Sequence, residues 1–215
     1  MNFKDKLEED IVKILVVGDA SVGKSSFIQR YVNNCFIEEY KCTIGLDFVT
    51  KIVERHGGRQ TRHRLQFWDI AGQERYTMLS RAYYRYARGC IIMFDLSDPA
   101  SFQNVQKWKK AVDSTTLDDN AAPVPCLLVA NKLDLATRAV TYAQIEELCK
   151  NHSFVQWTET SVKDGTNVNE AVTYLLDVIL DRSPSVYEPS EYELVDPVHL
   201  INEEYKLERK PCKTC

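Results

Sequence analysis

One stretch constrains the fold of this chain more than any other. Residues 11–17 form an apolar run that leads directly into Gly18-Asp19-Ala20-Ser21-Val22-Gly23-Lys24-Ser25. The spacing Gly-x-x-x-x-Gly-Lys-Ser is typical of a loop that binds phosphate between a buried strand and a helix. Residues 27–32 carry apolar side chains at helical spacing, so the strand–loop–helix context is predicted as well. For the eight residues taken alone, the alternative is a glycine-rich turn with a solvated lysine.

The apolar pattern beyond this loop predicts an α/β fold. Residues 64–68, 90–96 and 126–130 form further apolar runs, and residues 102–112 and 168–179 have apolar side chains at helical spacing. Strands that alternate with helices indicate parallel βαβ units with helices on both faces of the sheet. Residues 46–54 and 62–68 flank His56-Gly57-Gly58-Arg59, a predicted hairpin turn that adds one antiparallel strand.

Length and composition indicate one globular domain followed by a different tail. The chain has 215 residues, 44% hydrophobic residues and a net charge of -4, which supports a sizeable core and argues against nucleic acid as a partner. We expect a short extension over residues 1–10, a domain over residues 11–181 and a flexible tail over residues 182–215. Residues 1–10 are too polar for a secretion signal, and no apolar run approaches the roughly 20 residues of a transmembrane helix. The five cysteines of the body are expected to be reduced thiols of a cytosolic protein.

The predicted phosphate loop carries its own chemistry. Glycines allow backbone N–H groups to turn towards a phosphate, and the following helix presents its positive N-terminal end. Lys24 is placed to reach the β- and γ-phosphate oxygens, and the Ser25 hydroxyl is placed to bind Mg²⁺. The other residues of the loop that we expect to contact nucleotide are Gly18, Ala20, Ser21, Val22, Gly23 and Ser26.

A second motif, Asn131-Lys132-Leu133-Asp134, predicts which base is bound. It follows the apolar residues 124–130 and therefore lies at the carboxyl end of a predicted strand, where α/β sheets bind ligands. The Asp134 carboxylate can accept from N1–H and the 2-amino group of guanine, a donor pair that adenine lacks. Asn131 can bridge loops and reach the base edge, while the stem of Lys132 can pack on the ring. The alternative for these four residues is a surface turn with a solvated Lys–Asp pair.

A third motif, Trp68-Asp69-Ile70-Ala71-Gly72-Gln73, also ends an apolar strand. Asp69 is placed to hold Mg²⁺, most directly through a water molecule. The Gly72 N–H can meet a γ-phosphate, and Gln73 has the donor and the acceptor needed to orient an attacking water. Gln73 and Lys24 are therefore the predicted catalytic residues, although Asp-x-x-Gly-Gln alone could be a plain turn.

Together these motifs make residues 9–181 resemble a Rab small GTPase of the Ras superfamily. The Rab character rests on residues 44–48, 68–75, 83–85 and 92–95. One branch of the Rab family, which serves lysosome-related organelles, melanosomes and the trans-Golgi, is resembled most at two places. These are Ile70 and the segment Trp157-Thr158-Glu159-Thr160-Ser161-Val162-Lys163. The resemblance implies a Ras-like G domain of the P-loop NTPase class, with a mostly parallel six-stranded sheet, one antiparallel strand and helices on both faces.

The resemblance also implies roles for residues outside the three motifs. Phe36 would stack against guanine, Thr43 would be the second protein ligand of Mg²⁺, and Ser161 and Lys163 would border the base. Val162 departs from the usual alanine, but the position is expected to act through its backbone N–H. The residues implied to face effectors are Ile44, Phe48, Trp68 and Tyr83, for which simple core packing is the alternative.

The implied function is a switch that hydrolyses GTP to GDP and phosphate with Mg²⁺, slowly on its own and faster with a GTPase-activating protein (GAP). The implied partners are an exchange factor (GEF), a GAP, a GDP-dissociation inhibitor or escort protein, a prenyltransferase and trafficking effectors. Two alternatives stay open: a nucleotide-bound scaffold without useful turnover, and a P-loop kinase or ATPase. The implied location is the cytoplasm, with cycling onto the cytosolic face of endolysosomal, lysosome-related or trans-Golgi membranes.

The tail ends in Lys210-Pro211-Cys212-Lys213-Thr214-Cys215, which permits prenylation of Cys212 and Cys215. One prenyl chain binds a membrane reversibly, and the basic residues of the last ten positions are few, so we expect both cysteines to be modified. An exposed thiol pair is the alternative. The resemblance also implies a phosphorylation site at Thr77.

Overall fold

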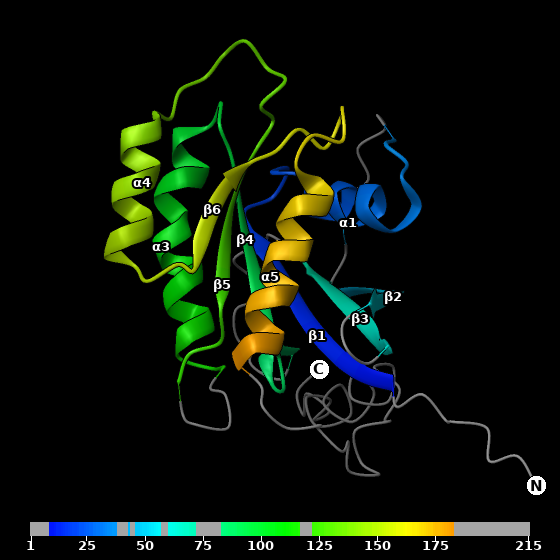
Figure 1. Ribbon diagram of the computed structural model, residues 1–215. Helices are drawn as coiled ribbons and strands as arrows, with labels where there is room; N and C mark the ends of the chain where they lie inside the picture. The colour runs from blue at the N-terminus through cyan, green and yellow to red at the C-terminus, as the bar shows by residue number, and fades with distance from the viewer. Residues whose placement is uncertain are drawn as a thin grey trace, which may run out of the picture. The chain divides into compact units, whose positions relative to one another are not determined.

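The computed structural model describes residues 9–37, 43, 46–56, 60–71, 83–116 and 122–182, all within a unit that ends at Pro184. The strands of this part form one six-stranded sheet in the order β2-β3-β1-β4-β5-β6 (Figure 1). β2 pairs antiparallel with β3, and every other neighbouring pair is parallel. The strands are β1 (Glu9–Gly18), β2 (Leu46–His56), β3 (Gln60–Ile70), β4 (Gly89–Asp95), β5 (Cys126–Asn131) and β6 (Gln156–Glu159).

Helices cover both faces of this sheet, as predicted. They are α1 (Lys24–Asn33), α3 (Pro99–Asp113), α4 (Tyr142–Asn151) and α5 (Val168–Arg182). α1 and α5 lie on one face, and α3 and α4 lie on the other (Figure 1). The expected α/β class, the mostly parallel sheet and the single antiparallel strand are therefore confirmed.

The central strands contain long apolar runs because both of their faces are buried. In β1, the side chains of Val12, Ile14 and Val16 pack in the cluster that includes α1 and α5. Leu15 and Val17 alternate with them and pack in the cluster that includes α3 and α4. One strand thus contributes to two hydrophobic cores.

α4 and β6 were not predicted as individual elements. α4 begins with a capping box, in which Thr141 and Gln144 exchange side-chain and backbone hydrogen bonds, and its buried residues are Ile145, Leu148 and Cys149. This Thr-x-x-Gln sequence before an apolar pattern is a recognisable helix start. β6 has only four residues and lacks a continuous apolar run, so its sequence carries little strand signal.

The parallel strands bring the predicted motifs to one edge of the sheet. The register pairs Val16 of β1 with Asp69 of β3, Gly18 with Met93 of β4, and Asp95 with Asn131 of β5. All four strands run in the same direction, so their carboxyl ends meet there. This edge is where open α/β sheets bind ligands.

Candidate nucleotide-binding site

Both glycines of the phosphate loop are required by close packing. Gly18 has φ +143°, and a Cβ atom there would lie 2.2 Å from the Met93 carbonyl oxygen. Gly23 has φ +101°, and its Cβ would lie 2.5 Å from Nδ2 of Asn131. Gly23 also occupies the N-cap position of α1, where it has no side chain to cap the helix. No side chain at this position therefore accepts from the backbone N–H groups of the first turn of α1. Such N–H groups are suited to bind an anion.

Lys24 is held inside the loop. Its side chain is buried, and Nζ donates to the carbonyl oxygens of Gly18 at 2.9 Å and Asp19 at 2.7 Å. These bonds curl the loop around the ammonium group. A positive charge therefore lies at the centre of the predicted phosphate site.

Asp19 anchors the same loop to α3, a contact that the sequence did not suggest. Its Oδ1 accepts from Trp108 Nε1 at 2.8 Å, and its Oδ2 accepts from Asn104 Nδ2 at 2.7 Å. Asp19 lies at a variable position of the loop motif, so the motif gives no signal for this contact. The bonds connect α3 to the residue whose carbonyl holds Lys24.

Three oxygen-bearing side chains from distant segments meet beside the loop. Ser25 Oγ lies 2.8 Å from Thr43 Oγ1, and it donates a short hydrogen bond to Asp69 Oδ2. Thr43 Oγ1 also lies 3.5 Å from the same carboxylate oxygen. Hydroxyl and carboxylate oxygens are hard ligands of the kind that Mg²⁺ prefers, usually completed by water and substrate phosphates. The described residues include no group of three or more His, Cys, Asp or Glu side chains that could hold another metal.

Asp69 supports a cation at this position. It is 2% exposed, and within the described part of the chain its Oδ1 has no hydrogen-bond partner. Burial raises the pKa of Asp69 above its usual value, although the Ser25 hydrogen bond and the Lys24 charge oppose the shift. A buried carboxylate oxygen without a partner is costly, and a divalent cation would supply the missing interaction. The residues present therefore fit Mg²⁺.

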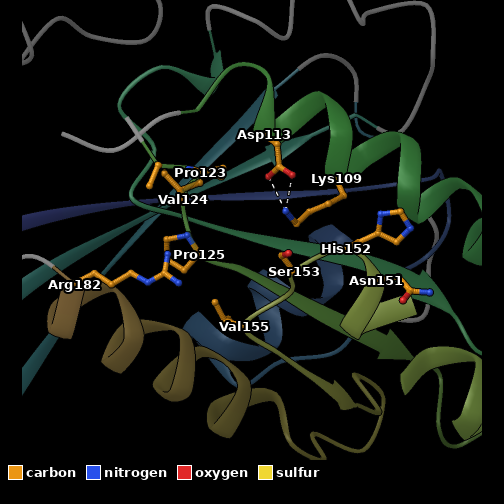
Figure 2. Close-up of a pocket in the computed structure, with 11 residues that line it drawn as sticks. Lys109, Asp113, Pro123, Val124, Pro125, Asn151, His152, Ser153, Val155 and Arg182 are labelled. Carbon is orange, nitrogen blue, oxygen red and sulfur yellow. Dashed lines mark hydrogen bonds and ion pairs between the residues drawn. The ribbon is translucent and has the colours of Figure 1, made fainter. Parts of the chain in front are cut away.

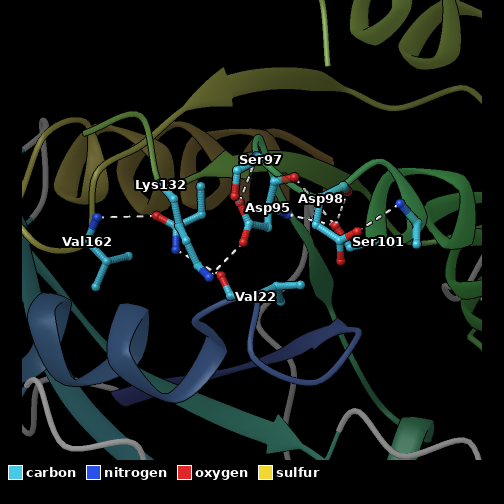
Figure 3. A network of polar contacts seen from close by, with 9 residues as sticks. Val22, Asp95, Ser97, Asp98, Ser101, Lys132 and Val162 are labelled. Carbon is cyan, nitrogen blue, oxygen red and sulfur yellow. Dashed lines mark hydrogen bonds and ion pairs between the residues drawn. The ribbon is translucent and has the colours of Figure 1, made fainter. Parts of the chain in front are cut away.

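Asn131 joins the phosphate loop to residues 160–162. Its Nδ2 donates to the Val22 carbonyl at 2.9 Å, and its Oδ1 accepts from Thr160 Oγ1 at 3.1 Å. The Val162 N–H also donates to Oδ1, at 3.2 Å (Figure 3). That N–H, expected to act on the base, thus already has an acceptor inside the protein.

The predicted base-binding residues lie around Asn131. Ser161 Oγ donates to Asp134 Oδ1 at 2.7 Å. Ser161 is buried and Asp134 is exposed, so the fixed hydroxyl orients the carboxylate at the surface. Lys132 Nζ forms an ion pair with Asp95 Oδ2 at 2.6 Å, which fixes the direction of its stem (Figure 3). Burial raises the pKa of Asp95, but hydrogen bonds from Lys132 and Ser97 outweigh it, so the pKa lies below its usual value.

Phe36 and the remaining loop residues complete this region. Phe36 is half-buried against the cluster of α1 and α5, and the Arg30 guanidinium carbon lies 5.9 Å from its ring centroid. Lys163 is exposed. In the phosphate loop, Ala20 and Ser21 are exposed, whereas Ser26 is half-buried in the first turn of α1.

Several predicted residues lie outside the described part of the chain. Among them are two residues expected to act on the γ-phosphate or water, one effector-facing residue, the phosphorylation site and the two lipidation sites. They are Gly72, Gln73, Ile44, Thr77, Cys212 and Cys215.

The expected effector-facing aromatics form a contiguous cluster. Phe48 and Trp68 meet edge to face with ring centroids 5.6 Å apart, and Tyr83 lies 6.4 Å from Trp68. Lys13 Nζ lies 3.7 Å from the centre of the Trp68 ring and donates to the Arg85 carbonyl at 2.8 Å. Trp68 is nearly buried, while Phe48 and Tyr83 are half-buried, so the cluster both packs the core and reaches the surface.

Two cavities of the described part lie away from these residues. One of about 550 Å³ is lined by the ends of α3, α4 and α5 and by residues 122–125 (Figure 2). It contains the Lys109–Asp113 ion pair rather than any residue of the three motifs. A second, of about 500 Å³, lies between α4 and β6.

Comparisons with known proteins agree with this architecture. Residues 13–181 match the family model described as the Ras family. The chain is 47% identical over 175 residues to Ras-related protein Rab-7L1 of Homo sapiens, covering 81% of this chain and 85% of that protein. The chain belongs to the Rab proteins of the Ras family.

Two other relatives extend the match further along this Rab protein. Ras-related protein Rab-32 of Homo sapiens is 40% identical over 203 residues, which is 94% of this chain and 88% of that protein. Ras-related protein Rab-32B of Dictyostelium discoideum is 40% identical over 206 residues, 96% of this chain and 78% of that protein. The predicted family is confirmed, and this Rab protein is a small GTPase, a GTP-binding switch of vesicle trafficking. None of its described helices has the length and apolar character needed to cross a membrane.

Proposed function

We propose that this Rab protein hydrolyses GTP to GDP and phosphate at the described edge of the sheet, and recruits effectors to organelle membranes while GTP is bound. The observation that carries the proposal is the buried Asp69 carboxylate, whose Oδ1 lacks a partner among the described residues, beside Ser25 and Thr43. A cation would stabilise such a group, and the phosphate loop next to it provides a reason for one.

Ser25, Thr43 and Asp69 would hold Mg²⁺, with Asp69 acting through a water molecule. The ion would neutralise charge on the β- and γ-phosphate oxygens. Lys24 adds a second positive charge, since its ammonium is already fixed at the centre of the loop. Preorganised charges of this kind account for much of the catalysis of phosphoryl transfer.

Gln73 would orient the attacking water, and the Gly72 N–H would bind the γ-phosphate. From the sequence we expect no arginine of the chain itself to act on the transition state. We therefore expect slow intrinsic turnover that a GAP increases by about 10³- to 10⁵-fold. Loss of the γ-phosphate would release Thr43 and Gly72, and effectors would read that difference.

The guanine base would be selected by Asp134, with Asn131, Lys132, Phe36 and residues 161–163 around it. The bond from Ser161 supports this role, since it orients the carboxylate before any base is present. An adenine base would leave the Asp134 carboxylate without its two donors. This arrangement favours GTP over ATP and disfavours the kinase or ATPase alternative.

Purification followed by nucleotide identification and single-turnover hydrolysis tests the proposal. We expect bound GDP or GTP, slow Mg²⁺-dependent hydrolysis and acceleration by an active Rab GAP. Bound adenine nucleotide would overturn the base assignment. Guanine nucleotide that is not hydrolysed even with GAPs would favour the scaffold alternative.

We further propose that Phe48, Trp68 and Tyr83, with Ile44, contact trafficking effectors. The exposed part of the aromatic cluster and the family membership support this role. Resemblance to the branch described above points to endolysosomal, lysosome-related or trans-Golgi membranes. Proximity labelling with GTP- and GDP-biased variants would identify the organelle, the effectors, the GEF and the GAP. Labelling that does not depend on the nucleotide would contradict the switch.

Cys212 and Cys215 are both proposed to be prenylated after delivery by an escort protein, with a GDP-dissociation inhibitor extracting the product. Intact mass of the membrane-extracted protein should show two added prenyl groups, and Cys212→Ser or Cys215→Ser should each become partly soluble. One added group with loss of the last three residues would show modification of Cys212 alone.

Phosphorylation of Thr77 is proposed as a control on partner binding. A phosphate would add about -1.5 to -2 charge and should weaken the binding of regulators that contact this segment. Regulator binding by phosphorylated and unmodified protein would be compared directly. Equal affinity would argue against this control.

A further inference from the structure

Arg30 connects three segments that have been assigned to the base. It lies in the last turn of α1, and its Nε donates to the Val162 carbonyl at 2.9 Å. Its Nη2 donates to the Lys163 carbonyl at 2.5 Å. These acceptors lie more than 130 residues further along the chain. One guanidinium therefore ties the helix of the phosphate loop to the loop that borders the base.

The same side chain also holds the backbone that leads to Phe36. Arg30 Nη1 donates to the Asn34 carbonyl at 3.3 Å, and the Asn34 N–H donates to the Arg30 carbonyl at 2.9 Å. Asn34 caps α1 in the left-handed conformation, two residues before Phe36. The guanidinium carbon lies 5.9 Å from the Phe36 ring centroid, within the range of a cation–π contact. Arg30 thus fixes both the ring and the chain that carries it.

Residues 161–166 are shaped to present carbonyls to Arg30. Gly165 N–H donates to the Ser161 carbonyl at 2.7 Å, and Asp164 N–H donates to Ser161 Oγ at 3.1 Å. Gly165 has φ +88°, and a Cβ there would contact Arg30 Cδ at 3.7 Å. Ser161 therefore holds this turn from within by hydrogen bonds, and Arg30 holds it from α1. Ser161 also orients Asp134.

We propose that Arg30 is a positioning residue for guanine selection, which holds the loop of residues 161–163 and the Phe36 ring in place on either side of the base. This inference rests on the proposed guanine site. Arginine suits the task because its planar group offers donors in several fixed directions, whereas a lysine ammonium cannot bridge the same set. A purely structural role, a cation at the C-terminal end of α1, is the alternative.

The two roles predict different results for Arg30→Ala and Arg30→Lys. If Arg30 orders the base loop, dissociation of fluorescent GDP in Mg²⁺ should become about tenfold faster in Arg30→Ala, as expected for the loss of hydrogen bonds from a charged donor. Arg30→Lys should show a smaller increase, because it keeps the charge and one donor group. Single-turnover hydrolysis of bound GTP separates binding from chemistry, because among the described residues Arg30 donates to Asn34, Val162 and Lys163.

Competition between GDP and IDP provides the decisive measurement. The IDP base lacks the 2-amino group, so the GDP:IDP affinity ratio reports the alignment of Asp134 and its loop. We expect Arg30→Ala to reduce this ratio about threefold or more. Equal weakening of GDP and IDP, or GDP dissociation within twofold of wild type in both variants, would overturn the proposal.

Arg55→Ala is the matched control. Arg55 also joins two elements, since it lies on β2, but it pairs with Asp177 of α5 rather than with the base loop. It should leave the GDP:IDP ratio unchanged, and thermal unfolding of each GDP-bound variant checks that the fold survives. If Arg30→Ala does not fold, a wild-type ratio in Arg30→Lys with unaltered GDP dissociation overturns the proposal. Failure of the guanine site itself would appear in the wild type, as no preference for GDP over ADP.

Discussion

Asp69 and Asp95 lie near the carboxyl ends of β3 and β4, the two parallel strands on either side of β1, yet their surroundings differ. Both side chains are nearly inaccessible to solvent. Asp95 Oδ2 pairs with Lys132 at 2.6 Å, and its Oδ1 accepts from the Ser97 N–H at 2.8 Å and from Ser97 Oγ at 2.7 Å. Asp69 Oδ2 accepts from Ser25, while Oδ1 has no partner among the described residues. The pKa of Asp95 is lowered and the pKa of Asp69 is raised.

This difference separates two halves of one site. On the base side, the chain satisfies its own polar groups, so Asn131, Lys132 and Asp134 are oriented before a ligand binds. On the metal side, the chain leaves a buried carboxylate undercompensated, and a bound cation would balance it. The base side is therefore oriented in advance to select the base, whereas the metal side gains stability when its ion binds.

The largest expected effect comes from the base side. Asp134→Asn exchanges a carboxylate acceptor for an amide, which suits the additional carbonyl of xanthine instead of the 2-amino group of guanine. The GTP:XTP affinity ratio should fall by on the order of 10³-fold, because a site that hydrogen-bonds one base strongly rejects an analogue without the matching donors. Competition binding measures the ratio, with ATP as the control. Unchanged selectivity would remove Asp134 from the base site.

The next effect tests the metal side. Ser25→Asn removes a hydroxyl from the Ser25–Thr43–Asp69 group, so GTP binding in Mg²⁺ should weaken by about ten- to a hundredfold, and more than GDP binding. The variant should also trap complexes with exchange factors. Affinities measured with Mg²⁺ and with EDTA separate the metal contribution. If the two conditions differ as they do in wild type, Ser25 is not a ligand.

A smaller effect is expected for the loop that both halves share. Trp108→Phe keeps an aromatic ring in α3 but removes the donor that binds Asp19 Oδ1. One hydrogen bond contributes about 1 kcal/mol, so nucleotide dissociation should become about fivefold faster without a change in base selectivity. Stopped-flow release of GDP and of IDP would show this. A change in their ratio would mean that α3 also acts on the base side.

The smallest effect compares the two carboxylates directly, through the pH dependence of unfolding in EDTA. The folded-state pKa of Asp69 is raised, so wild type gains stability as pH falls through that value, and Asp69→Asn should be more stable than wild type near neutral pH. The folded-state pKa of Asp95 is lowered, so its contribution is present above the unfolded value of about 3.9 and is lost as pH falls below it. Asp95→Asn should therefore destabilise the protein at neutral pH.

The sign of each difference is the measurement that matters in these unfolding curves. The advantage of Asp69→Asn should shrink on acidification, and the deficit of Asp95→Asn should also shrink, but at lower pH. Chemical denaturation of wild type and both variants at a series of pH values would record the two trends. Equal signs at neutral pH would contradict the contrast between the two halves.

Local pattern by itself determined the fold class, the family and the three motifs. Continuous apolar runs predicted strands buried on both faces, and the two glycines of the phosphate loop stand where the Met93 backbone and the Asn131 side chain come close. The motif following β5 predicted the base because neighbouring residues of that motif carry the base-binding chemistry. α4 was missed although its capping box was readable, and β6 was missed because four residues carry too little periodicity.

Only the tertiary structure decided which side chains support those motifs. Arg30 reaches carbonyls more than 130 residues away, Trp108 reaches Asp19 across 89 residues, and Asp95 meets Lys132 through the pairing of β4 with β5. The supporting residues Arg30, Trp108 and Asp95 lie outside the three nucleotide motifs. Their partners are set by strand register and helix packing, which bring together atoms that no spacing along the chain relates. Hydrogen bonds and ion pairs form between neighbours in space, so these contacts exist only once the sheet is assembled.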